Sequence, residues 1–289
     1  MATATEWFAG GRPRTLPAAV APVIVGTGAA AFASGAHLGR AALAAGVALA
    51  LQVGVNFAND YSDGVRGTDL ERLGPTRLTA SGAARPRQVL TAALVSFAVG
   101  AGFGIALVAL TGLWWLLAVG AVAIGAAWCY TGGRKPYGYL GLGEVGVFGF
   151  FGLVATVGTT YTQALVVPWP AWVAASGVGL LACALLMANN LRDVPTDSLA
   201  GKRTLAVRLG ERRARRLYAL ELLGALVLAA VCAIAAPWSL LTLLLTLPMT
   251  LLALTVLAGA RGRLLIPVLA GTGLVSLGYG VLLGIGLAL

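Results

Sequence analysis

Charged residues are scarce in this sequence. Only 10% of its 289 residues are Asp, Glu, Lys or Arg, whereas soluble domains carry roughly 25%. This scarcity excludes an ordinary soluble domain, because too little polar surface is available to cover it. Cysteine is also rare: Cys129, Cys183 and Cys232 lie in separate apolar runs without metal-ligand spacing. We therefore expect neither a disulfide nor a zinc site.

Long apolar runs dominate the chain instead. Hydrophobic residues make up 59% of it, and several runs of about 18–24 residues are long enough to span a bilayer. We expect an all-α membrane protein, a single domain over residues 1–289, with about nine transmembrane helices in one bundle around a central cavity. The expected spans cover residues 15–34, 40–60, 88–110, 113–130, 141–164, 169–191, 215–236, 238–259 and 264–287.

The positive charges fix an orientation for these spans. The net charge of +10 could indicate nucleic-acid binding, but its distribution favours a lipid bilayer as partner and no nucleic acid. With a cytoplasmic N-terminus, all of the 20 Lys and Arg residues except Arg40 fall in cytoplasmic segments, as the positive-inside rule requires. The Arg212–Arg216 run is interpreted as part of this solvated topology signal. The ten acids lie in or beside the same segments, which the rule does not demand.

A weak repeat places two of the acid clusters in corresponding positions. The second expected span ends in Asn56–Asp63, and the sixth ends in Asn189–Asp197. The two clusters are four helices apart, so both point to the cytoplasmic side. This predicts pseudo-repeat halves over residues 15–130 and 141–259, followed by a last helix over 264–287, facing each other across a cavity.

The clusters have the composition of a magnesium site. On a helix, Asn59 and Asp60 share a face or its edge with Asp63, and Asn190 pairs in the same way with Asp193. Pro195 interrupts the second set and leaves open whether Asp197 is helical or already in a loop. Carboxylates gathered at one depth need a cation between them, and Mg²⁺ binds such groups together with phosphate oxygens. The alternative is that these acids form ordinary salt bridges with loop arginines.

Basic and aromatic residues also occur near the cytoplasmic ends of the expected spans. Lys202 comes after Asp197, and Arg134 and Lys135 follow the fourth span, where they could grip phosphate oxygens or simply contact lipid headgroups. Tyr130 and Tyr139 are candidates to stabilise an allylic cation through their ring faces. The alternative for them is an interfacial aromatic belt.

These segments resemble the UbiA superfamily of intramembrane prenyltransferases. The resemblance rests on the stretch from Asn59 to Asp63 and on the later stretch Asn190–Leu205, which contains Asp193, Asp197 and Gly201-Lys202-Arg203-Thr204-Leu205. Within the superfamily, the chain is most similar to the 1,4-dihydroxy-2-naphthoate polyprenyltransferases of menaquinone synthesis. Further segments carry that likeness: Trp7, Gly11–Pro17, Asn59–Asp69, Tyr130–Gly133 and Gly141–Glu144.

The resemblance implies an activity and a set of site residues. The activity is Mg²⁺-dependent transfer of a polyprenyl group from polyprenyl diphosphate to 1,4-dihydroxy-2-naphthoate, with loss of CO₂ and diphosphate, giving demethylmenaquinone. Magnesium and diphosphate would be held by Asn59, Asp60, Asp63, Asp193 and Asp197. Phosphate charge would be neutralised by Lys202, Arg134, Lys135 and Arg12. One position departs from the pattern: Gly67 stands where many members have Asp, and the next acid is Asp69.

Other functions remain open at this stage. The same chemistry could act on 4-hydroxybenzoate, homogentisate, or a haem or chlorophyll precursor. A lipid-headgroup transferase of the CDP-alcohol type is a second alternative, but the Asp-Gly-Ala-Arg pattern of that family is absent from this sequence. A transporter is a third alternative; inverted halves would favour it, whereas the two acid clusters of this chain repeat in parallel. We expect a multi-pass protein of the plasma membrane with its active site on the cytoplasmic side.

Overall fold

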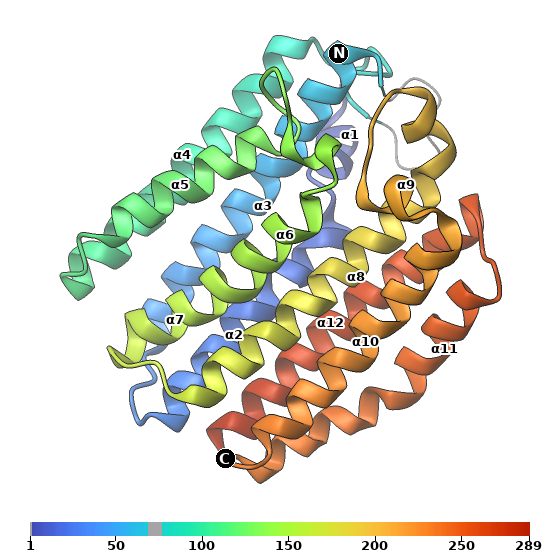
Figure 1. Cartoon of the computed structure of the whole chain (residues 1–289). Coiled ribbons are helices and arrows are strands. Elements are labelled where there is room, and N and C mark those ends of the chain that lie inside the picture. Colours follow the sequence, from blue (N-terminus) through green and yellow to red (C-terminus); the bar gives the residue numbers. More distant parts are fainter. Residues whose placement is uncertain (1, 69–76) are drawn as a thin grey trace.

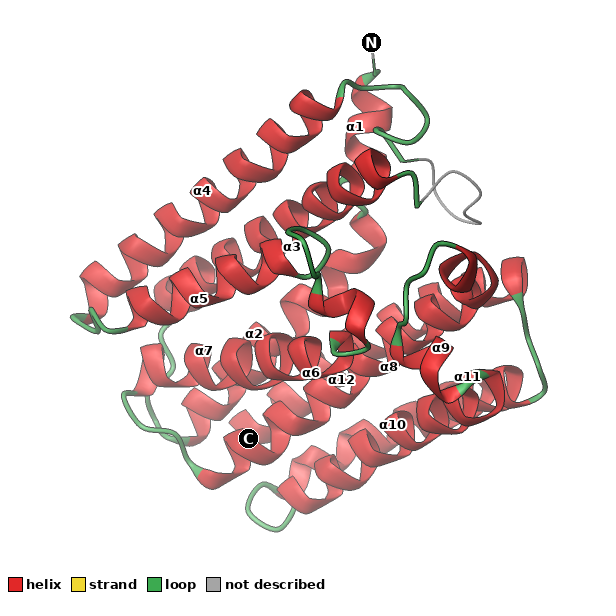
Figure 2. Cartoon of the chain, turned by 45° about the horizontal axis from the view of Figure 1, so that its top comes forward, coloured by secondary structure: helices red, strands yellow, loops and turns green. Residues whose placement is uncertain are grey.

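The fold is a bundle of helices. A computed structural model describes residues 2–68 and 77–289, and the regular structure within those residues is entirely helical (Figures 1 and 2). The N-terminus lies at the end of the bundle that carries α1 and α9, and the C-terminus lies at the opposite end (Figure 1). The main helical rods are α2 (Leu16–Phe32), α3 (Leu38–Arg66), α4 (Pro86–Thr111), α5 (Leu116–Cys129), α6–η3–α7 (Gly143–Val147, Phe148–Val154, Ala155–Ala164), α8 (Trp169–Leu199), α10 (Glu211–Cys232), η4–α11 (Pro237–Leu245, Thr246–Leu257) and η5–α12 (Gly262–Leu264, Leu265–Ala288).

The predicted membrane fold is confirmed. Every one of the predicted spans coincides with one of these rods. Seven helical segments of the described chain are long and apolar enough to cross a membrane, and α5 is a shorter apolar helix. The remaining rod, α10, begins with the charged stretch Glu211–Arg216 before it becomes apolar. The chain is therefore a multi-pass membrane protein.

Four short elements at one end of the bundle were not predicted. They are too short to give a hydropathy signal: α1 (Ala4–Gly10), η1 (Pro13–Thr15), η2 (Tyr137–Leu140) and α9 (Leu205–Leu209). The open question at Pro195 is also answered, because α8 continues through this proline to Leu199 and keeps Asp197 helical. Proline has no backbone N–H, so it removes one hydrogen bond from a helix, but the backbone hydrogen bonds of the neighbouring residues can keep the helix continuous.

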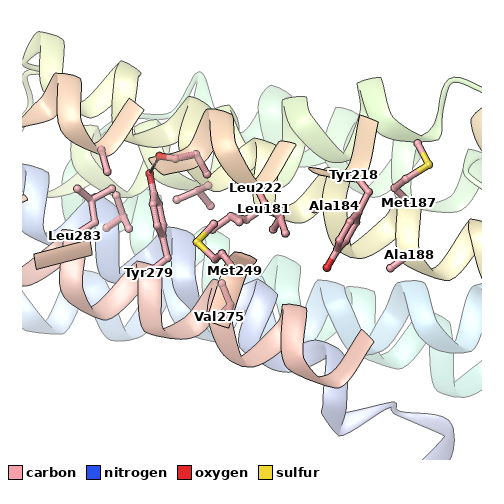
Figure 3. Packing of buried hydrophobic residues seen from close by; sticks show 14 of the residues in the cluster. Leu181, Ala184, Met187, Ala188, Tyr218, Leu222, Met249, Val275, Tyr279 and Leu283 are labelled. Carbon is pink, nitrogen blue, oxygen red and sulfur yellow. Dashed lines mark hydrogen bonds between the residues drawn. The ribbon is translucent and has the colours of Figure 1, made fainter. Parts of the chain in front are cut away.

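The main apolar core lies between α2, α8, α10, α11 and α12, and Figure 3 shows part of it. Two fully buried tyrosines cross it, and each finds a polar partner, as buried phenols require. The Tyr279 hydroxyl donates to the carbonyl of Ala225 at 2.9 Å, and the Tyr218 hydroxyl lies 2.7 Å from the Thr272 Oγ1. All three cysteines are free, as expected.

Glycines allow two of these core helices to touch. A Cβ added at Gly28 in α2 would lie 2.2 Å from the carbonyl oxygen of Gly284 in α12, which is closer than any real contact. Lipid provides little hydrophobic drive between helices, so close backbone packing of small residues supplies the attraction. The α2–α12 contact therefore depends on glycine at both positions.

Arg215 does not belong to a solvated arginine run, and the prediction for it was wrong. It is buried, and its guanidinium donates to the carbonyls of Val256 and Ala260, each at 2.7 Å, and to Glu211 at 3.0 Å. The last carbonyls of a helix have no partner within it, so Arg215 of α10 caps the end of α11. Glu211 also binds Arg261 at 2.8 Å, which joins three segments.

We predict that Arg215→Ala destabilises the protein. The substitution removes two bonds made by a charged donor: the Ala260 carbonyl loses this donor, and the Val256 carbonyl keeps the Gly259 N–H at 3.1 Å. The loss of such bonds costs about 1.5–3 kcal/mol. The measurement is the thermal unfolding midpoint in detergent. Arg216→Ala is the matched control, because Arg216 is exposed and should cost at most about 0.5 kcal/mol. Equal midpoints for the two variants would contradict the capping role.

Candidate functional site

A large cavity runs along the inside of the bundle. Its volume is about 1170 Å³, and it is lined by faces of α2, α3, α4, α5, α7 and α8. On α3 the lining residues recur every three or four positions, which is one face of a helix. They run from Ala44 to Asp63: Ala44, Val47, Ala48, Leu51, Gln52, Val55, Asn56, Asn59, Asp60 and Asp63. The apolar part of this stripe comes first and the polar part comes last, at the end of α3.

Asp63 is the centre of the polar end. It is 4% exposed, and three groups from different parts of the chain surround its carboxylate. The Lys202 Nζ lies 3.2 Å from its Oδ2, and the Arg77 Nη2 lies 4.0 Å from the same oxygen. The Tyr139 hydroxyl donates to its Oδ1. A buried carboxylate needs such partners, because an unpaired charge in a low-dielectric interior is costly.

Tyr139 is oriented by this cluster. Its ring lies 4.8 Å from the Lys202 Nζ, within the range of a cation–π contact. Burial raises the pKa of Tyr139, and the neighbouring Asp63 carboxylate raises this pKa further, while Lys202 lowers it. The phenol therefore remains a proton donor across the physiological range.

The second acid cluster lies on α8 and lines the same cavity. The Arg192 guanidinium donates two hydrogen bonds of 2.7 Å to the Asp193 carboxylate and a third, of 2.9 Å, to the Asn189 Oδ1. Asp197 is one helical turn further on, and its carbonyl accepts the Lys202 N–H at 2.8 Å. Lys202 thus connects the end of α8 to Asp63 of α3. The two predicted acid clusters therefore open into one cavity from two helices.

The two predicted asparagines also line the cavity, and each is held by a neighbour. The Asn59 Oδ1 accepts from the Thr131 hydroxyl at 2.7 Å, and the Asn190 Nδ2 donates to the Glu144 Oε1 at 3.1 Å. Thr131 lies in the segment after α5, and the Thr131 backbone carbonyl accepts a hydrogen bond from the Arg66 guanidinium. These contacts fix the orientation of both side-chain amides.

Arg12 reaches the cavity from an unusual backbone conformation. Its φ of 51° is in the left-handed region, which a residue with a Cβ adopts at a cost. Its Nη2 donates to the carbonyl of Asn56 at 3.4 Å, and the Asn56 side chain donates back to the carbonyl of Gly11 at 2.9 Å. The polar end of α3 therefore holds the N-terminal segment in place.

Of the remaining predicted residues, one lines the cavity and two do not. Tyr130 lines the cavity and packs edge-on against Tyr137, with ring centroids 5.5 Å apart. Arg134 and Lys135, in contrast, are exposed and do not line the cavity. Asp69 lies outside the described residues.

Several residues at or beside the site were not predicted from the sequence, among them Arg77, Thr131 and Glu144. Arg77 lines the cavity beside Asp63 but looked like one more loop arginine. Thr131 and Glu144 orient the asparagines and were noticed only as parts of longer motifs. Glu144 did carry a signal, since an acid at the start of an apolar span is rare and usually functional.

The donor set suits a hard metal ion. No three acidic, cysteine or histidine side chains of residues 2–68 and 77–289 form a ready-made metal site. Asp63, Asp193, Asp197 and Asn59 nevertheless supply hard oxygen donors around one cavity. Mg²⁺ typically takes one or two carboxylates and completes its shell with phosphate oxygens and water. These residues therefore fit a magnesium ion that arrives with a phosphate group.

Sequence comparison assigns the chain to a family and shows close relatives. The model of the UbiA prenyltransferase family matches residues 19–266. The chain is 55% identical, over 278 residues, to the 1,4-dihydroxy-2-naphthoate octaprenyltransferase of Mycobacterium tuberculosis, and the match covers 96% of this chain and 94% of the relative. It is 41% identical to the protein of the same name from Escherichia coli, over 76% of this chain and 74% of that one.

The fold agrees with these matches. A solved structure of a UbiA homologue from Archaeoglobus fulgidus, bound to DMAPP and Mg²⁺, superposes with a TM-score of 0.68 at 14% identity. The superposition covers 98% of this chain and 99% of that one. The helical bundle, the matched length and the sequence identity agree, and the chain belongs to the UbiA prenyltransferase family.

Proposed function

We propose that this protein transfers a polyprenyl group from a polyprenyl diphosphate to 1,4-dihydroxy-2-naphthoate. The observation that carries the proposal is one cavity with two chemically different parts. Its polar end collects carboxylates and cations from α3, α8 and the segments beside them, and the rest of its lining is mostly apolar. A prenyl diphosphate has the same division. The acceptor is proposed from the names of the relatives that are 55% and 41% identical.

The polar end would receive the diphosphate. Lys202, Arg77 and Arg12 line it and carry the positive charge that pairs with phosphate oxygens. Asp63, Asp193, Asp197 and Asn59 would hold Mg²⁺. When bound, the metal acts as a Lewis acid that stabilises the charge developing on the departing diphosphate.

The apolar stripe of α3 would receive the prenyl chain. Ala44 and Asp63 are 19 positions apart, which corresponds to about 28 Å of helix at 1.5 Å per residue. Facing it are small and apolar residues of α4, α5 and α7, among them Gly104, Gly120 and Gly158. A flexible hydrocarbon chain can therefore extend away from the diphosphate without contacting water.

The proposed reaction conserves atoms and charge. The C1–O bond of the prenyl diphosphate breaks, and diphosphate leaves with the bonding pair. The electron-rich ring of the naphthoate attacks the allylic carbon, and its carboxylate leaves as CO₂, which restores aromaticity. The residues of the cavity bind the diphosphate, exclude water from the allylic cation and keep Tyr139 protonated next to Asp63. Tyr130 and Tyr139 offer ring faces to the cation.

The polar end would face the cytoplasm of a plasma membrane. Six arginines lie at the end of α3, near the end of α8 and at the start of α10, while Arg40 lies at the start of α3, at the other end. The six are Arg66, Arg192, Arg212, Arg213, Arg215 and Arg216. The positive-inside rule supports this orientation.

The proposed substrates predict a specific pattern of turnover. Purified protein in detergent or vesicles should release pyrophosphate and form prenylated naphthoquinol when given 1,4-dihydroxy-2-naphthoate and prenyl diphosphates of several lengths. Chelation of Mg²⁺ should abolish turnover, and adding it back should restore it. Faster turnover with 4-hydroxybenzoate or homogentisate would show a different acceptor. Absence of pyrophosphate release with every acceptor would refute a transferase.

The carboxylates of both helices are predicted to be essential. Asp63→Ala and Asp193→Ala should each lower turnover about 100-fold or more, the usual loss when a group that stabilises developing charge is removed. Arg213→Ala is the control, since this exposed residue is outside the cavity and should change turnover about twofold at most. Folded Asp63→Ala and Asp193→Ala proteins with wild-type rates would contradict the assignment.

Tyr139 is predicted to act as a neutral donor. Because its pKa is raised above the ordinary value of about 10, its phenol stays protonated between pH 6 and 9. Tyr139→Phe should lower turnover about tenfold, while the pH–rate curves of the two proteins remain parallel in this range. A descending alkaline limb present in the wild type and absent from Tyr139→Phe would indicate a titrating phenol instead.

A further inference from the structure

The Asp60 carboxylate accepts hydrogen bonds from backbone amides of a segment that lies beside α3. Its Oδ2 accepts the N–H of Leu78 at 2.8 Å, and its Oδ1 accepts the N–H of Thr79 at 2.9 Å. These two residues open a short helical turn over residues 77–82, hereafter the Arg77 turn, in which the Ser81 N–H donates to the Arg77 carbonyl at 3.0 Å. The first N–H groups of such a turn have no partner within it. Asp60 therefore caps the turn from a neighbouring helix.

Gly64 provides the space for this contact. It follows Asp60 by four positions, so both residues lie on the same face of α3. A Cβ at Gly64 would lie 2.5 Å from the Thr79 Cβ and 3.3 Å from the Ala80 nitrogen. Any side chain at this position would push the Arg77 turn away from the helix. Asp60 and Gly64 thus form one seat for the turn.

The seat determines where Arg77 lies. Arg77 begins the turn, lines the cavity and places its Nη2 4.0 Å from the Asp63 Oδ2. Leu78, the next residue, is 2% exposed and packs in the same apolar cluster as Phe57 of α3. The backbone of the turn is therefore held by a charge-assisted cap and by a buried side chain.

Asp60 differs from Asp63 in what satisfies its charge. Asp60 is 1% exposed, and each of its two oxygens accepts a backbone N–H, a pairing that stabilises the ionised carboxylate. Asp63 is surrounded by the side chains of Lys202, Arg77 and Tyr139, which can exchange their partners when a ligand enters. The backbone of the Arg77 turn can make no such exchange without unfolding its first residues.

We infer that Asp60 is a positioning residue that seats the Arg77 turn, so that Arg77 meets the diphosphate, and that Asp60 is not a metal ligand. This departs from the role that the sequence predicted for Asp60. The kinetic part of the inference rests on the proposed function, but the seat itself does not.

The first test needs no turnover. Hydrogen exchange of the full-length protein in detergent reports the backbone amides of the Arg77 turn. Asp60→Ala should accelerate exchange in peptides covering residues 77–82, because it removes the acceptor of two of these amides. Asp63→Ala leaves the acceptors of both amides in place, so it should accelerate their exchange much less than Asp60→Ala does. Unchanged protection in Asp60→Ala would overturn the seat, whatever the activity of the protein.

The second test separates positioning from metal binding. Asp60→Ala should raise KM for the best prenyl diphosphate about tenfold, a typical loss for an outer-shell partner, with an unchanged Mg²⁺ concentration for half-maximal rate. Arg77→Ala should raise this KM similarly, and the double variant should be no worse than the single ones. Asp63→Ala should raise the Mg²⁺ requirement.

Gly64→Ala provides a matched variant that removes no acid. It should reproduce the higher KM and the faster exchange of Asp60→Ala, and it keeps the inference testable if Asp60→Ala fails to fold. A raised Mg²⁺ requirement in Asp60→Ala together with normal kinetics in Gly64→Ala would make Asp60 a ligand and overturn the inference. An inactive wild-type protein would count against the proposed function and leave the exchange test decisive for the seat.

Discussion

The polar end of this protein depends on the pairing of one buried carboxylate. Asp63 lies at the end of α3 inside a membrane bundle, where an unpaired charge would be strongly destabilising. Its partners come from the Arg77 turn, from η2 and from the segment after α8. These segments are far apart in the sequence, so the pairing draws three connections onto one helix end. The same requirement that stabilises the fold therefore assembles the site.

The two sides of the bundle play different mechanical roles. Helices α2, α8, α10 and α12 pack through small residues and buried tyrosines, with backbones in contact at Gly28 and Gly284. On the opposite side of the cavity, α5 contains no buried residue. Its faces are turned to the cavity or to the outside, so this helix forms a thin wall between cavity and lipid. The closely packed side holds the acid cluster of α8 in place, while the thin side leaves volume for an apolar substrate.

Hydropathy predicted the spans well because each must satisfy all its backbone bonds internally and expose apolar side chains to lipid. The acid clusters were also predictable, since ionisable residues at span ends stand out in such a chain. The role of Arg77 could not be predicted, because its position depends on the cap from Asp60 and the space above Gly64. Arg215 looked like a topology signal for the same reason: its partners are backbone carbonyls at the end of α11 and just after it, which have no sequence signature.

The charge balance of the cavity suggests how it could accept a highly charged substrate. Lys202 and Arg77 already neutralise Asp63, and Arg192 neutralises Asp193, so the acids are paired within the protein itself. A diphosphate that enters with a divalent cation brings both signs of charge. The carboxylates would then pair with the metal and the cations with the phosphate, so that no charge would be left unpaired in a low-dielectric site. Such an exchange requires side chains that can move between partners, and it requires the backbone around them to stay fixed. Asp60 meets the second requirement, because its two carboxylate oxygens bind the backbone amides of Leu78 and Thr79 and not side chains that can change partners.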